Sequence, residues 1–115
     1  MAAVHYGLSN ITAVVDWNGL QIDGPNEDVM TVAPIGKKFE GFGWTVLECD
    51  GHDMAALKEA FAAADEEDER PTVIIAKTVK GKGVSFMEND ILWHYRTPQG
   101  EEYEAALKEL EAQRP

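Results

Sequence analysis

The sequence predicts an α/β fold with a mostly parallel sheet and helices packed against it. Three short apolar runs rich in β-branched residues have the length of buried strands, and they cover residues 11–16, 44–48 and 72–76. Continuous apolar runs favour parallel strands, which are covered on both faces. Helical patterns lie between and after these runs, so the expected arrangement is a layered α/β fold with right-handed crossovers.

Three helices are predicted from boundary residues and apolar spacing. A helix over about residues 35–41 ends at Gly41, as helices often do. Asp53 is placed to cap the next helix, at the end of a strand-to-helix turn that begins at Asp50. One apolar face of that helix is expected to consist of Met54, Leu57, Phe61 and Ala64. The last helix covers about residues 101–112, and its expected apolar face consists of Tyr103, Leu107 and Leu110.

The stretch from residue 79 to residue 100 predicts a loop. It has no persistent apolar period and is interrupted by Gly81, Gly83, Pro98 and Gly100. Loops that follow the carboxyl ends of parallel strands are where α/β proteins place their ligand sites, so this stretch is a candidate binding region.

Length and composition limit the classes of function. A chain of 115 residues suits one domain, and its net charge of -11 argues against a nucleic-acid-binding surface, which would be basic. Cys49 is the single cysteine, which fits a reducing, cytoplasmic setting. No window reads as a secretory signal or a membrane span, so we expect neither export nor a membrane partner.

The segment DWNGLQIDG, residues 16–24, follows the first predicted strand and offers oxygen ligands. The Asn18 side chain and nearby backbone carbonyls are hard donors of the kind that Mg²⁺ binds, alongside water and phosphate oxygens. Asn18-Gly19 is also a common turn dipeptide, so a plain turn explains the segment equally simply when it is considered alone.

The segment KTVKGKG, residues 77–83, follows the third strand and combines ammonium groups with glycines. Such a loop can hold phosphate, and it can equally be a solvated surface loop. His94 lies farther along the same irregular region, where it could bind phosphate or transfer a proton near neutral pH. A lone histidine is more often structural, so His94 needs support from other residues.

Four segments in one order resemble the transketolase family over nearly the whole chain. They are NITAVVDWNGLQIDG, FEGFGWTVLECDGHD, PTVIIAKTVKGKGVSFME and the pair WH. The resemblance is to the thiamine diphosphate-binding domain, most closely where that domain is a separate subunit. It implies that residues 1–115 are the rear portion of such a domain, with a partial doubly wound, Rossmann-like sheet.

The resemblance implies a role for each matched residue. Asn18, through its side chain, and Leu20, through its carbonyl, would bind Mg²⁺, and Ile22 would lie beside the thiazolium ring of the cofactor. Lys80 would face the cofactor or the substrate, and His94 would do so as the catalytic residue. The implied activity is transfer of a two-carbon ketol unit between sugars or sugar phosphates, with the cofactor performing the chemistry and the protein orienting it.

Two departures from the family pattern limit this transfer. The family's Gly-Asp-Gly motif, whose Asp also binds Mg²⁺, normally precedes the Asn by about thirty residues, whereas seventeen residues precede Asn18 here. The pyrimidine-binding domain is also absent, so we expect an oligomer with a second polypeptide that carries both parts, and little activity from this chain alone. Relatives commonly have Gly after the loop His, whereas Tyr95 and Arg96 follow His94 here.

Two other functions fit the same residues. The chain could be a non-catalytic remnant or interaction module, because the missing front portion should leave an exposed sheet edge that invites pairing. It could also belong to a related thiamine diphosphate-dependent synthase that joins the two-carbon unit to a different acceptor.

Overall fold

A computed structural model describes residues 1–114, which form two compact units. Unit 1 consists of Met1–Trp17 and Val32–Thr78, and unit 2 consists of Asn18–Thr31 and the chain from Val79 onward. Each unit is described by itself.

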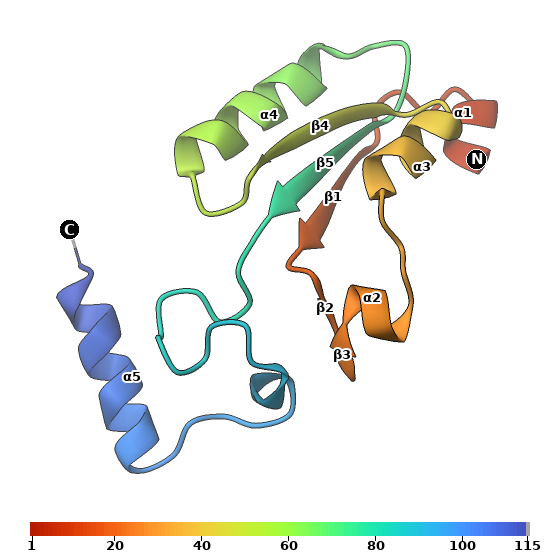
Figure 1. Ribbon diagram of the computed structural model, residues 1–115. Coiled ribbons are helices and arrows are strands. Elements are labelled where there is room, and N and C mark those ends of the chain that lie inside the picture. Colours follow the sequence, from red (N-terminus) through yellow and green to blue (C-terminus); the bar gives the residue numbers. More distant parts are fainter. Residues whose placement is uncertain (115) are drawn as a thin grey trace. The chain divides into compact units, whose positions relative to one another are not determined.

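Unit 1 is built on a three-stranded parallel sheet. Its strands are β1 (Thr12–Trp17), β4 (Thr45–Asp50) and β5 (Thr72–Lys77), in the spatial order β1-β5-β4, and Figure 1 shows them side by side. Thr72 of β5 pairs with Thr12 of β1 on one side and with Thr45 of β4 on the other. The central strand is buried from Thr72 to Ala76. The predicted α/β class, the parallel sheet and all three strands are therefore confirmed.

Helices pack on both faces of this sheet. Helix α4 (Met54–Glu66) contacts β4 and β5, and its buried residues join a small apolar cluster that contains Ala60, Ala64 and Ile74. Helix α3 (Ile35–Gly41) approaches the sheet so closely that a Cβ added at Gly36 would lie 3.3 Å from the Ile75 side chain. Because side chains alternate along a strand, Ile74 and Ile75 point to opposite faces, which places α4 and α3 on opposite sides. This arrangement is the partial doubly wound sheet that was predicted.

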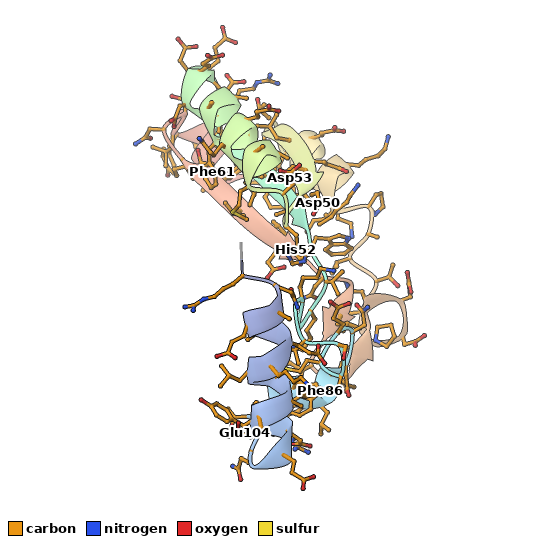
Figure 2. The ribbon with its side chains drawn as sticks, turned by 90° about the vertical axis from the view of Figure 1, so that its left-hand side faces the viewer. Asp50, His52, Asp53, Phe61, Phe86 and Glu104 are labelled. Atoms are coloured by element: carbon orange, nitrogen blue, oxygen red, sulfur yellow. The ribbon has the colours of Figure 1, made fainter. Side chains whose placement is uncertain are left out.

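Helix α4 begins where the sequence predicts, but it buries a different set of residues. The Asp53 carboxylate accepts hydrogen bonds from the amides of Ala55 (2.8 Å) and Ala56 (3.2 Å), and Figure 2 shows Asp53 beside Asp50 and His52 at the turn before the helix. The predicted face is wrong for Met54 and Phe61, which are 64% and 44% exposed.

The reason for this correction is that α4 packs on β4 and β5 through small side chains. Ala60 and Ala64 are 8% and 5% exposed, since alanine lets the helix approach the sheet closely. The larger Phe61 lies outside that contact, although its spacing along the helix suggested burial.

Unit 2 contains short elements and one longer helix. Strands β2 (Leu20–Gln21) and β3 (Gly24–Pro25) form an antiparallel pair, and helix α2 (Asn26–Val29) follows directly. The predicted loop after β5 includes one 3₁₀ turn, η1 (Ile91–His94), before helix α5 (Glu101–Ala112). The short β2, β3, α2 and the N-terminal α1 (Ala2–His5) of unit 1 were not predicted.

Helix α5 has the predicted bounds, but its predicted apolar face is largely exposed within unit 2. Tyr103, Leu107 and Leu110 are 52%, 39% and 49% exposed, whereas Ala106 is buried. Across residues 1–114, none of the helices combines the length and the apolar character needed to cross a bilayer.

Candidate functional site

The five residues predicted to form the site line one cavity in unit 2. The cavity has a volume of about 200 Å³. Its lining residues are Asn18, Leu20, Gln21, Ile22, Lys80, Ile91 and His94. They come from two stretches that are far apart in the sequence, so folding of unit 2 brings together the DWNGLQIDG segment, the lysine loop and the loop histidine.

Asn18 and Leu20 place two oxygen donors on this cavity. The Leu20 amide donates to Asn18 Oδ1 at 3.0 Å, which folds the segment after β1 into a tight turn. An amide oxygen has two lone pairs, so Asn18 Oδ1 can still accept or coordinate once more. Leu20 pairs with Pro25 in the β2-β3 ladder, and proline has no N–H to donate to the Leu20 carbonyl. These two hard oxygens suit a cation such as Mg²⁺.

Backbone contacts hold the turn that carries these oxygens. Gly19 has a φ of 76°, a conformation that glycine adopts without strain, and its carbonyl accepts from the Asn26 amide at 3.0 Å. Asn26 is buried at the start of α2. The Gln21 side-chain amide donates to the Met30 carbonyl at 2.7 Å. The segment is therefore closed on itself at both ends, and its shape does not depend on a ligand.

Lys80 is presented at the base of a folded loop. The Lys80 carbonyl accepts from the Asn89 amide at 2.9 Å, which closes the loop between them. Gly81 has a φ of 74°, and a Cβ added there would lie 2.3 Å from the Met87 carbonyl oxygen. Only glycine fits this position, so the glycine after Lys80 is required by the close approach of the loop's two arms.

The three lysines of the predicted phosphate loop separate in the structure. Lys77 lies at the end of β5 in unit 1 and pairs with Glu48 at 2.8 Å, and this hydrogen bond, with the attraction of the carboxylate, raises the pKa of Lys77. Lys82 pairs with Glu88 at 3.4 Å. Of these three ammonium groups, that of Lys80 belongs to the residue that lines the cavity, which narrows the sequence prediction to one lysine.

His94 ends the 3₁₀ turn η1, and the turn is fixed by its neighbours. Asp90 caps it by accepting from the Leu92 amide at 2.8 Å. Trp93 anchors it because the indole Nε1 donates to the Phe86 carbonyl at 3.0 Å and the two rings lie 5.3 Å apart. The His94 imidazole is exposed, so it is available to a ligand on a turn that is held in place.

His94 also lines a second and more open cavity of about 620 Å³. The other lining residues are Trp93, Tyr95, Arg96, Thr97 and Gln99. The Arg96 guanidinium lies 4.6 Å from the centre of the Trp93 ring and pairs with Glu102. The bulk predicted after His94 therefore forms the wall of an open concavity next to the histidine.

Gln21 and Ile91 line the smaller cavity but were not among the predicted site residues. Gln21 lies inside the DWNGLQIDG segment, so its position was the available signal. Ile91 carries no sequence signal, because an isolated isoleucine in a loop is indistinguishable from packing. Residues 1–114 contain no group of three His, Cys, Asp or Glu side chains placed to hold a metal, so a cation at this cavity would rely on Asn18, Leu20 and oxygens from other molecules.

Sequence comparison places this cavity in a known context. A family model described as the transketolase thiamine diphosphate-binding domain matches residues 1–112. One of the two apulose-4-phosphate transketolase subunits of Phocaeicola vulgatus is 40% identical over 110 residues, covering 96% of this chain and 39% of that protein. A 6-deoxy-6-sulfo-D-fructose transketolase subunit from a Clostridium species is 35% identical over 104 residues, covering 90% of this chain and 38% of that protein. The chain thus spans about two fifths of the length of these relatives.

Structural comparison gives the same answer. The chain is similar to the crystal structure of transketolase from Campylobacter jejuni, with a TM-score of 0.83 and 28% identity over 97% of this chain and 17% of that one. Transketolase structures from Pichia stipitis match with TM-scores near 0.7. The matched family model and the shared fold lead to one conclusion: the chain belongs to the transketolase family, as part of its thiamine diphosphate-binding domain.

Proposed function

We propose that this chain supplies part of the Mg²⁺-diphosphate site of a transketolase-type enzyme that transfers a two-carbon ketol unit between sugars. The single observation that carries the proposal is the cavity lined together by Asn18, Leu20, Ile22, Lys80 and His94. Each was expected there by resemblance, and a solvated loop or an isolated turn would not require all of them to meet.

Each lining residue offers a distinct interaction. Asn18 Oδ1 and the Leu20 carbonyl would bind the cation that neutralises the diphosphate. Ile22 is 55% exposed and offers apolar surface to a heteroaromatic ring. Lys80 adds a positive charge for a phosphate group, and His94 can donate or accept a proton at a sugar hydroxyl. The bound cofactor would supply the bond-breaking chemistry.

Two protein oxygens are too few for a complete site, so a second polypeptide has a defined contribution. We expect it to carry the Asp of the Gly-Asp-Gly motif and the pyrimidine-binding domain. The naming of both relatives as transketolase subunits supports such a division. Their names also specify a phosphorylated sugar and a sulfonated sugar, so we propose an anionic sugar as the substrate, acting in a cytoplasmic setting.

Reconstitution tests this proposal. The chain is mixed with polypeptides encoded next to it and assayed for ketol transfer with thiamine diphosphate and Mg²⁺. We expect activity from the mixture, little from the chain alone, and a loss of at least about 10-fold for Asn18→Ala at limiting Mg²⁺, by the scale on which metal-site substitutions act. Asn18→Asp keeps an oxygen donor and should retain more activity. Asn10→Ala, at an exposed asparagine before β1, is the control.

The outcomes separate the alternatives. Restored activity that is indifferent to Asn18 would contradict the metal role. Cofactor binding without ketol transfer to any sugar, but with transfer to another acceptor, would favour the related synthase. Absence of cofactor binding in every mixture would favour the non-catalytic interaction module.

A further inference from the structure

Tyr95 joins the two stretches that form the smaller cavity. Its hydroxyl donates to the Ile22 carbonyl at 3.1 Å, across 73 positions of the sequence. Its ring also meets the neighbouring His94 imidazole edge to face, with centroids 5.1 Å apart and an interplanar angle of 87°. One side chain therefore contacts a residue from each of the cavity's two halves.

The position of this contact explains why it matters for the cavity. Ile22 lies in the turn between β2 and β3, which is made of two-residue strands and has little packing of its own. His94 lies at the end of η1, which is fixed by Trp93 and Asp90. The Tyr95 hydrogen bond ties the weakly packed turn to the fixed one, so it sets the separation of Ile22 and His94 across the cavity.

We propose that Tyr95 is a positioning residue that forms the cofactor cavity before the cofactor binds, an inference that rests on the function proposed above. A glycine after the loop histidine, the residue common in relatives, has no side chain to make either contact. The tyrosine thus lowers the ordering that binding would otherwise require, and this raises affinity without touching the reacting atoms.

Tyr95→Phe isolates the hydrogen bond, because it removes the hydroxyl and keeps the ring against His94. A net hydrogen bond of ordinary strength corresponds to about three- to ten-fold in affinity. We expect Tyr95→Phe to weaken thiamine diphosphate binding by that factor in the complex with the partner polypeptide, with kcat at saturating cofactor unchanged. Tyr95→Gly, which also removes the ring contact, should weaken binding further. Tyr103→Phe, at an exposed tyrosine of α5, is the control.

Amide hydrogen exchange on the full chain measures the hydrogen bond without any cofactor. Tyr95→Phe should speed exchange in residues 20–26 and leave β5 of unit 1 unchanged, and a rate equal to that of the unsubstituted chain would overturn the proposal. Faster exchange with unaltered cofactor affinity would also overturn it. If the unsubstituted complex fails to bind thiamine diphosphate, the proposed function fails and this role fails with it, whereas binding that is insensitive to Tyr95 removes this role alone.

Discussion

The two units of the chain are stabilised in different ways. In unit 1 the apolar residues of β5 are buried between helices on both faces, from Val73 to Ala76, and α4 adds Ala60 and Ala64. In unit 2 the buried apolar side chains among the described residues are Val84 and Ala106. Its segments are joined instead by hydrogen bonds between side chains and backbone, such as those of Trp93 and Tyr95.

This difference shows where stability and function are located. The part of the chain with an apolar core carries none of the proposed ligand-binding residues, and the part that carries all of them has little core. A site held by polar contacts responds to single hydrogen bonds and to bound ligands, whereas a packed sheet responds mainly to lost volume. Four substitutions measure this contrast.

The largest loss of stability is expected in the core of unit 1. Ile74 is fully buried, so Ile74→Ala should lower the free energy of unfolding by about 2 to 5 kcal/mol. Leu107→Ala removes a similar side chain from the exposed face of α5 in unit 2 and should cost less than about 1 kcal/mol. Urea denaturation measures both, and equal losses would contradict the difference between the units.

Gly81→Ala tests the backbone of unit 2. The added Cβ would meet the Met87 carbonyl and a residue with positive φ would be strained, so we expect a cost above the ordinary strain of about 1 to 3 kcal/mol. Gly100→Ala also has positive φ but has open space around it, so it isolates the strain. Hydrogen exchange in residues 79–90 would report the difference, and identical behaviour of the two variants would show that the loop can move aside.

Asp53→Ala removes a helix cap in unit 1 without altering its core. Because the carboxylate accepts two amide hydrogen bonds at the start of α4, we expect a loss of about 1 kcal/mol in thermal unfolding experiments. Asp65→Ala, near the C-terminal end of the same helix, should be neutral or slightly stabilising, since it removes a negative charge from the negative end of the helix dipole. A larger effect at Asp65 would contradict the capping assignment.

The smallest effect is expected from acidification of unit 2. The Ser85 amide and hydroxyl donate to Glu109 at 2.6 Å and 2.7 Å, and these bonds lower the pKa of Glu109, the amide contributing most. A lowered folded-state pKa means that the contact is complete above the ordinary pKa of glutamate and is lost as the pH falls through the lowered value.

The Ser85 amide resonance in nuclear magnetic resonance spectra should therefore move at a pH below the usual glutamate range. The corresponding transition should be absent in Glu109→Gln, while Glu111→Gln serves as the control. A transition within the usual range would contradict the lowered pKa.

The sequence predicted unit 1 better than unit 2, for a physical reason. Strands and helices of six or more residues repeat their apolar pattern often enough to be recognised, as β5 and α4 do. The pairs and single turns of unit 2, such as β2 with β3, are too short for any period. Helix faces were predicted less well than helix bounds, because Phe61 and Leu107 have the right spacing but lie beyond the contacts that bury Ala60 and Ala106.

The candidate site could be predicted residue by residue only with the help of the family resemblance. Asn18, Lys80 and His94 each had an ordinary local explanation, and nothing in their spacing required them to meet. The order of the four segments supplied that link. The contact between Tyr95 and Ile22 could not be predicted, since a tertiary hydrogen bond across 73 positions has no local signature.

Calorimetric titration of thiamine diphosphate into the assembled complex, with and without Mg²⁺, tests the central claim most directly. The cavity that contains Asn18 and Leu20 predicts saturable binding that requires Mg²⁺ and weakens by at least about 10-fold in Asn18→Ala, with Asn10→Ala unaffected. Binding of equal strength in Asn18→Ala, or binding that does not require Mg²⁺, would contradict the assignment of Asn18 to the cation.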